Sequence, residues 1–423
     1  MTAGLVLCES HGMRRATLFA AAAFVCTVGF FSVRAVRKFD FSETGDPERW
    51  ALCDFRDVVY YPVVSMLEGH DPYDAPTYVR TYRVGAPLPP YSPSTLLAHL
   101  PFGLAPLVVA GFAYFAWTIV LMMVVSYLTL LLCGAKPTVV GILGITTAIL
   151  LTRPGNWNLL LGQLGTEMTA ATYLALQSAR KRPWVGGFGL AVTTIKPTYG
   201  IPLAVMMLAR GELPAVVIGV CAGATLLALA LAVLAVETGG LVGVLQSLHE
   251  TAIRFPTTYP TVTSINRVDV IGLVSRLLGT VPGVGVQLAI SLGVLAVGVL
   301  AVRRLARRPP SAASLTMSAS ITCLVVLTWT YHLTYDVQVI TLPLVAAVLA
   351  LTGTPWSVRA GLRFAAIGLL AIPFVNYLAS TSALDALRLG GTWQLALLSL
   401  NGTALLAALG LHVGTALSPG CAK

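Results

Sequence analysis

Acidic residues gather in one part of this chain, residues 38–93, directly after its first long apolar run. This segment holds nine of the 17 acids. Asp54 and Asp57 stand three residues apart, so on a helix both carboxyls would lie on one face. Apolar and aromatic neighbours can keep such a carboxyl partly dry, which raises its basicity. We therefore expect a general base at Asp54 or Asp57; the alternative is a solvated acid, or an ion-pair partner for Arg49 or Arg56.

A lysine in an apolar setting is the second chemical candidate. Lys196 precedes Pro197 and separates two short apolar runs, Trp184–Thr194 and Tyr199–Leu208. Neither run is long enough to cross a hydrocarbon core of about 30 Å as a helix. A break between two half-helices exposes backbone polar groups that must line a cavity. An ammonium there can bind a phosphate as a point charge; the alternative is that Lys196 snorkels to the membrane surface.

Other hydrogen-bonding side chains stand at the ends of apolar runs. His332 ends the sequence Trp329-Thr330-Tyr331-His332 and could bind a phosphate or orient a sugar, or be an ordinary interfacial histidine. Donors in short loops suit hydroxyls or a phosphate, although Asn and Gln at such places are also common helix caps. These loop residues are Arg153, Asn156, Asn158 and Gln163 in one loop, and Arg254 and Arg267 in another.

Composition places the chain in a membrane. Hydrophobic residues make up 56% and charged residues 10%, and the mean hydropathy is +0.81. Soluble domains carry about 25% charged residues. The apolar runs have the length of membrane helices rather than that of alternating barrel strands. The net charge of +10 lies in short basic clusters between these runs, which is typical of cytoplasmic membrane loops and argues against a nucleic-acid partner.

The cysteines and the first residues indicate neither a metal site nor a cleaved leader. The seven cysteines have no CxxC and no spacing paired with histidine, so we expect no disulfide framework, no cofactor and metal-independent chemistry. Met13-Arg14-Arg15 before an apolar run resembles a signal sequence. No small-x-small cleavage site follows, so we expect an uncleaved first span.

Ten full spans are expected, with a short interfacial helix at Ser94–Phe102 and a short, re-entrant segment at Val268–Gly279. No internal repeat or separate soluble domain is evident. The chain is thus expected to be one all-α polytopic membrane domain, residues 1–423, with residues 38–93 as an outer catalytic loop. The ten spans are Ala16–Val36, Leu107–Leu132, Thr138–Leu151, Gln163–Ala179, Leu213–Val236, Val284–Val302, Leu315–Thr330, Val337–Leu351, Ala360–Ala379 and Thr392–His412.

The basic clusters predict the orientation of these spans. They fall on one side of the membrane if the two runs around Lys196 form a hairpin, whereas one kinked span would break the pattern. Residues 38–93, Thr152–Gly162, Glu237–Arg267, His332 and Asp385 then lie on the outer face of the cell membrane. The clusters are Arg14-Arg15, Lys136, Arg180-Lys181-Arg182, Arg210, Arg303-Arg304 with Arg307-Arg308, and Arg359 with Arg363.

Four stretches, in order along the chain, share a pattern with a known family. They are Asp54-Phe55 leading to Tyr60-Tyr61 and Leu67-Glu68-Gly69-His70-Asp71-Pro72-Tyr73; Pro89-Pro90-Tyr91-Ser92-Pro93 with Leu96–Pro101; Gly162-Gln163 through Arg180–Arg182 to Lys196-Pro197; and Trp329–His332 with Pro343. Together they resemble glycosyltransferase family 87 of the GT-C superfamily. The resemblance implies a bundle of about 10–12 transmembrane helices that transfers a sugar from a polyprenyl-phosphate donor to a lipid or glycan acceptor.

The resemblance also assigns roles to residues. Asp54 matches the family's loop aspartate and His332 its outer-face histidine, while Asp57 is an additional acid inside the motif. Lys196, Gln163, Arg153, Tyr91 and Arg267 are the further candidates for binding the donor's phosphate or sugar. Because a phosphate leaves readily as an anion, no general acid is needed, and one carboxylate is enough to take the proton from the acceptor hydroxyl. Direct displacement of the phosphate then inverts the anomeric centre.

Three functions remain open at this point. The first is transfer of mannose, or next of arabinofuranose, with Asp54 favoured as the base. The second is a transporter or flippase of lipid-linked saccharides, which also uses broken helices but commonly shows internal repeats. The third is a lipid-linked polysaccharide ligase of related architecture.

Overall fold

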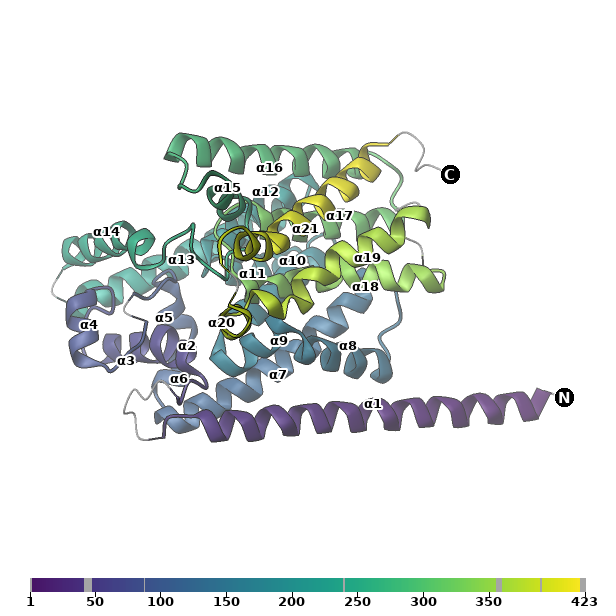
Figure 1. Cartoon of the computed structure of the whole chain (residues 1–423), viewed down its shortest axis with the longest axis horizontal. Helices are drawn as coiled ribbons and strands as arrows, with labels where there is room; N and C mark the ends of the chain where they lie inside the picture. Colours follow the sequence, from purple (N-terminus) through teal and green to yellow (C-terminus); the bar gives the residue numbers. More distant parts are fainter. Residues whose placement is uncertain are drawn as a thin grey trace.

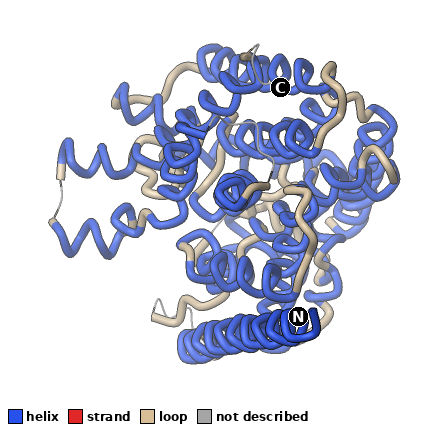
Figure 2. Tube along the Cα trace, turned by 90° about the vertical axis from the view of Figure 1, so that its right-hand side faces the viewer, coloured by secondary structure: helices blue, strands red, loops and turns tan. Residues whose placement is uncertain are grey.

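The computed structural model describes residues 2–41, 48–86, 88–238, 240–354, 360–388 and 390–418. Among these residues it contains helices and loops, with two isolated bridges but no strand (Figure 2). Glu43 and Asp46 of the acidic segment, and Cys421, lie outside the described residues. The expected all-α architecture is confirmed.

Within the described ranges, seven helical segments are long and apolar enough to cross a membrane, by length and composition. They coincide with seven of the ten predicted spans. Figure 1 shows most of them running in roughly one direction, with α1 along the edge of the bundle. The segments are α1 (Thr2–Lys38), α7 (Leu107–Leu132), α13 (Leu213–Glu237), α16 (Val284–Ala306), η3–α18–η4 (Thr334–Ile340, Thr341–Leu349, Ala350–Thr352), α19–η5 (Ala360–Val375, Tyr377–Ala379) and α21 (Gly391–Leu417).

The other three predicted spans are present as helices, but none of them alone has the length of the seven full spans. Helix α8 (Val139–Leu151) bends by 80° into α9 (Arg153–Trp157) and η2 (Asn158–Gly162), and this pair would make an eighth span. Helices α10 (Gly165–Ser178) and α17 (Ala312–Thr328) have 14 and 17 residues. Both are buried along most of their length, so protein rather than lipid surrounds them. Hydropathy alone does not separate such an interior helix from a full span.

The two half-helices around Lys196 are present. They are α11 (Pro183–Thr193) and α12 (Pro197–Ala209), and Lys196 is the residue that precedes the first turn of α12. Proline at the first helical position suits this start because its missing N–H would have no helical partner. The short segment near residue 270 forms α15 (Val270–Leu278), capped by the Asp269 side chain.

The first loop, residues 38–93, folds into a layer of short helices at one end of the bundle. In Figure 1 this layer lies where α1 ends, and the beginning of α1 and the end of α21 lie at the opposite end. The next two helices, and the 18-residue α14, belong to the same layer. Its helices are α2 (Cys53–Phe55), η1 (Arg56–Tyr60), α3 (Tyr61–Leu67), α4 (Ala75–Thr81), α5 (Ser94–Ala98), α6 (Leu100–Gly103) and α14 (Leu241–Thr258).

Helix α14 falls in a region that sequence analysis treats as loop. Its Val244 packs into a small core with Tyr73 of the first loop, and the Thr251 hydroxyl donates to the Tyr73 carbonyl at 3.1 Å. Pro256 near its end and several exposed polar residues make its sequence look irregular. A second short helix near the C-terminal spans, α20 (Thr381–Leu387), completes the described elements.

Candidate active site

A cavity of about 1230 Å³ opens between the first-loop layer and the membrane bundle. Its walls come from α2–η1, the residues 79–92, the inner face of α14, and the segments around Gln163, Lys196 and Tyr331–Tyr335. Five of the eight predicted site residues line it, although they come from three distant parts of the sequence. These five are Asp54, Asp57, Tyr91, Gln163 and Lys196.

Asp54 faces this cavity and is held by Gln163. The side-chain nitrogen of Gln163 donates to Oδ2 of Asp54, and its carbonyl oxygen accepts from the Tyr91 hydroxyl at 3.0 Å. These two bonds fix which way the Gln163 amide points. Burial raises the pKa of Asp54 from 3.8 to about 6; the Gln163 hydrogen bond opposes this rise and the Asp57 charge adds to it. Asp54 is therefore a carboxylate near neutral pH, with the basicity that suits proton abstraction.

A close backbone contact brings Asp54 to Gln163. Gly162 has φ +75°, and a Cβ at this position would lie 2.5 Å from Cβ of Phe55. The Leu52 N–H donates to the Leu160 carbonyl at 2.7 Å, which joins α2 directly to η2. Only glycine adopts that φ readily and leaves room for Phe55. The Gly162-Gln163 pair therefore lets α2 approach closely enough for the contact with Asp54.

Asp57 is fully engaged inside the first loop. Its Oδ1 accepts from Arg56 Nε at 2.7 Å, and its Oδ2 accepts from the Gly85 and Ala86 N–H groups at 2.8 and 3.1 Å. The Asp57 side chain is 3% exposed, whereas Asp54 is only half-buried. Asp57 thus holds the Gly85–Ala86 segment in place. Asp54 has the freer carboxyl and is the better-placed base.

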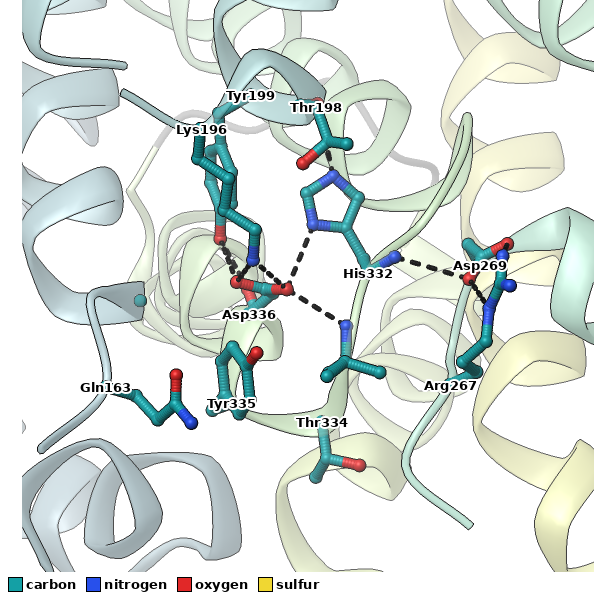
Figure 3. Close-up of polar contacts among 12 residues, drawn as sticks. Gln163, Lys196, Thr198, Tyr199, Arg267, Asp269, His332, Thr334, Tyr335 and Asp336 are labelled. Atoms are coloured by element: carbon teal, nitrogen blue, oxygen red, sulfur yellow. Dashed lines mark hydrogen bonds and ion pairs between the residues drawn. The ribbon is translucent and has the colours of Figure 1, made fainter. Parts of the chain in front are cut away.

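Lys196 lies at the opposite wall of the cavity and has a buried counter-ion. Its Nζ lies 2.7 Å from both carboxylate oxygens of Asp336 (Figure 3). The rings of Tyr199 and Tyr335 also face the ammonium, at 5.4 and 5.1 Å from their centroids. An ammonium has three hydrogens, so one remains after the two bonds to Asp336. Lys196 can therefore still donate one hydrogen bond to a ligand, although its positive charge is already balanced by Asp336.

The Trp329–His332 stretch holds the turn next to Lys196. Trp329 Nε1 donates to the Thr198 carbonyl at 2.7 Å, and Nε2 of His332 lies 3.2 Å from the same oxygen. Nδ1 of His332 lies 3.1 Å from Asp336 Oδ2 (Figure 3). Nε2 thus has an oxygen acceptor within reach, while Nδ1 lies near a carboxylate oxygen without the angle of a hydrogen bond. His332 is fully buried, behind cavity-lining neighbours on its own segment.

Arg267 supports His332 from the far side of the cavity wall (Figure 3). Its guanidinium pairs with both oxygens of Asp269 at 2.7 and 2.8 Å. The Asp269 carboxylate accepts in turn from the His332 main-chain N–H at 3.3 Å. Burial raises the pKa of Asp269, but Arg267 more than offsets this and the pKa is lowered overall. Arg267 is not among the residues that line the cavity.

Arg153 and its neighbouring loop donors do not line the cavity either. Arg153 is fully buried and donates to the main-chain carbonyls of Asn376 and Ala379 at 2.8 and 3.2 Å. Asn158 donates to the Tyr335 carbonyl at 2.9 Å, so it fastens η2 to η3. The last two loop candidates bond outside the cavity: Asn156 donates to the Tyr377 hydroxyl at 3.0 Å, and Arg254 to Glu250 at 3.2 Å.

Sequence analysis missed Asp336, Asp269 and Tyr335. Asp336 lies one residue before the predicted span Val337–Leu351 and four residues after His332, and in the structure it falls within the apolar segment Thr334–Thr352. A carboxylate in such a position is rare and commonly has a basic partner, so this signal was available. Tyr335 lines the cavity together with Tyr91, and its ring faces Lys196.

No group of three or more potential metal ligands occurs in the part of the chain that the structure describes. The groups at the cavity that could take part in chemistry are the Asp54 carboxyl, the buried Lys196–Asp336 pair and the histidine beside that pair. These are groups suited to proton abstraction and to holding an anion.

Comparisons with known proteins give one clear result. Neither the curated proteins nor the solved structures contain a match to this chain. The family model of glycosyltransferase family 87 matches residues 90–330, more than half of the chain. This match includes Tyr91, Gln163 and Lys196 and ends just before His332, and it favours sugar transfer over the transporter alternative. The chain therefore belongs to glycosyltransferase family 87 and is a multi-pass membrane glycosyltransferase.

Proposed function

We propose that this protein transfers a sugar from a polyprenyl-phosphate donor to a lipid or glycan acceptor, with Asp54 as the general base. The observation that carries the proposal is the place of Asp54: a half-buried carboxyl with a pKa near 6, oriented by Gln163 in the wall of a large cavity. Enzymes place a general base in such a setting because it is ionised at neutral pH and still basic enough to act.

The reaction needs one proton acceptor and one anion site. Asp54 takes the proton from the acceptor hydroxyl while that oxygen bonds to the anomeric carbon. The bond between this carbon and the donor's phosphate oxygen breaks, and polyprenyl phosphate leaves with the electron pair. The attack comes from the face opposite the leaving group, so the anomeric configuration inverts.

Lys196 is the donor-side cation that best fits the departing phosphate. It lines the cavity and retains one ammonium hydrogen, while His332 and Asp336 lie directly behind it. The other predicted phosphate ligands, Arg153 and Arg267, have their guanidinium groups bonded elsewhere. We therefore assign them to positioning the walls rather than to binding the donor.

The cavity lining suits a sugar bound next to a lipid. Aromatic rings contribute much of it, and such rings pack against the apolar faces of sugars while their hydroxyls and N–H groups bond the polar edges. The aromatic residues are Trp50, Tyr73, Tyr91, Trp157, Phe255, Tyr259, Tyr331 and Tyr335. Mannose is our first expectation for the sugar and arabinofuranose the second.

We place the reaction on the outer face of the cell membrane. The first-loop layer lies at the end of the bundle where α1 ends, and the beginning of α1 lies at the opposite end (Figure 1). Arg14 and Arg15 stand at the start of the apolar part of α1, Arg14–Lys38. Basic residues that flank a first span favour the cytoplasmic side. The opposite end, with the cavity, then faces outward.

A donor panel tests this proposal. Purified protein is given radiolabelled short-chain polyprenyl-phosphate sugars, with native membrane lipid as acceptor. Product from one donor identifies the sugar and supports the proposal. Release of free sugar or movement of the donor across the membrane, without a glycosylated product, would contradict it.

A further inference from the structure

Asp336 has the largest set of polar contacts of the charged groups around the cavity, yet it does not line the cavity itself. It stands in the first turn of η3 and is fully buried. Its two oxygens meet one main-chain donor and three side chains (Figure 3). These partners are Lys196 at 2.7 Å on each oxygen, Tyr199 at 3.2 Å, the Leu333 N–H at 2.9 Å and His332 Nδ1 at 3.1 Å.

This carboxylate joins the two basic residues that come from different parts of the chain. Lys196 directly precedes α12, and His332 follows α17. Nε2 of His332 also lies 3.2 Å from the carbonyl of Thr198, in the first turn of α12. Without Asp336, the buried Lys196 ammonium would have no counter-ion beside it. A buried cation that lacks a counter-ion tends to lose its proton.

The geometry points to Asp336 as a positioning residue for the cavity's anion site: it keeps Lys196 protonated and aimed into the cavity, with His332 fixed behind it. The ligand that this site takes is the phosphate of a polyprenyl phosphate. The inference rests on the proposed function for the identity of that anion. It goes further in stating that the phosphate is bound by a balanced ion cluster rather than by an isolated lysine.

The neighbours of the Lys196 ammonium leave it one open direction for a ligand. Tyr199 and Tyr335 stand on two sides of the ammonium, and Asp336 takes a third. The remaining direction leads to the cavity that Lys196 lines. A ligand oxygen arriving there completes the coordination of the ammonium, and Asp336 thereby sets the direction from which the phosphate is bound.

The charged and titratable groups around the cluster come from five elements. They are Lys196 and Tyr199 at α12, His332 and Tyr331 before η3, Tyr335 on η3, Tyr91 of the first loop, and the Arg267–Asp269 pair that holds the His332 main chain. Removing Asp336 leaves two basic groups among tyrosines. We therefore expect binding of the phosphate to fail at lower pH in the variant than in the natural protein.

The test measures binding, so it does not depend on transfer. The affinity of the full-length protein for a short-chain polyprenyl phosphate is measured between about pH 7 and 10, the range in which lysine pKa values are shifted by burial. Asp336→Asn is expected to lower this affinity about 10- to 100-fold, as loss of an orienting partner does at metal sites. The decline of the affinity at alkaline pH should also begin at a lower pH in this variant than in the natural protein. Asp336→Glu, which keeps the charge, should recover part of the affinity.

Three controls separate positioning from general damage. Binding of the neutral polyprenol should not change in Asp336→Asn. In a Lys196→Met background the same substitution should add little further loss, because the two residues act as one unit. Glu212→Gln removes another buried acid, paired with Arg210 at 2.9 Å, and should leave phosphate binding unchanged.

Unchanged or tighter binding of polyprenyl phosphate by Asp336→Asn would overturn the inference, because Asp336 would then only repel the anion. Equal losses for polyprenol and polyprenyl phosphate would also overturn it, since they indicate structural damage. Inorganic phosphate bound as tightly as polyprenyl phosphate would contradict the assigned ligand. A natural protein that binds polyprenyl phosphate but transfers no sugar would count against the proposed function alone.

Discussion

Gln163 donates its side-chain N–H to the Asp54 carboxylate, and the two residues lie 109 positions apart in the sequence. Tyr91 fixes the Gln163 amide from its other end. This relationship joins two of the stretches on which the family resemblance rests. Under the proposal that Asp54 is the base, Gln163 orients this base and lowers its pKa, in addition to any contact with the donor.

Removing the Gln163 side chain should change the pH dependence of transfer. Asp54 acts as a carboxylate, so activity is low below its pKa of about 6 and rises as the pH passes that value. The Gln163 hydrogen bond favours the charged form, so Gln163→Ala raises this pKa and moves the acidic limb to higher pH. The rate should also fall about tenfold, the effect of losing a hydrogen bond to a charged group.

The measurement is the pH profile of kcat/KM for the donor. Gln177→Ala, a half-buried glutamine on α10 that does not line the cavity, is the matched control and should leave the profile unchanged. An acidic limb that stays in place in Gln163→Ala would show that Gln163 does not tune the base.

Gly162→Ala should separate the base from Gln163 without touching either side chain. The new Cβ would lie 2.5 Å from Phe55 Cβ at a backbone φ of +75°, so α2 must move. We expect at least a tenfold loss of transfer, equivalent to about 1.4 kcal/mol. Gly144→Ala, at an open position in α8, is the control. Full activity in Gly162→Ala would mean that the close approach of α2 and η2 is not required.

Asp57→Asn should weaken the first loop more than the chemistry. Its carboxylate balances Arg56 and accepts two main-chain N–H groups at Gly85 and Ala86. The substitution should cost about 1–3 kcal/mol of local stability, because the ion pair is lost and one acceptor becomes a donor. Limited proteolysis between residues 79 and 92 measures this. A complete loss of transfer in a variant whose loop is as resistant as that of the natural protein would make Asp57 the base instead.

Arg153→Met tests whether Arg153 binds the donor or supports the fold. Its guanidinium holds the Asn376 and Ala379 carbonyls, so its loss leaves buried acceptors unpaired and should lower stability by about 3 kcal/mol. The Tm in detergent should fall, while KM for the donor in the folded fraction stays unchanged. A raised KM with an unchanged Tm would restore Arg153 to the donor site.

Sequence reasoning selected several residues that the structure brings to one cavity. A lysine or histidine is rare in an apolar segment, and Asp54 follows the first span closely. Asp54, Lys196 and His332 stand out by chemistry alone, and the break before Pro197 follows from its short flanking runs. The partners of these residues could not be read in the same way. Gln163 reaches Asp54, and Asp336 reaches Lys196, only through tertiary packing across more than 100 positions.

The fold was predictable in class but not in detail. Apolar length identified seven spans correctly, because lipid-facing helices must be long and continuous. It did not separate α10 and α17, which protein surrounds, from full spans. It also gave no sign of α14, whose Val244 packs on the first loop and whose Leu248 and Phe255 line the cavity. Arg153 and Arg267 looked like phosphate ligands by type, yet buried carbonyls and Asp269 take up their donors.

The most direct test of the account compares the natural protein with Asp54→Asn in both sugar transfer and donor binding. Asparagine keeps the size of the side chain but cannot accept the proton. We predict a loss of about 10²- to 10⁴-fold in kcat, the usual contribution of a general base, with donor affinity changed less than about twofold. Asp54→Asn with natural transfer activity and natural donor binding would contradict the central claim that Asp54 is the base of this glycosyltransferase.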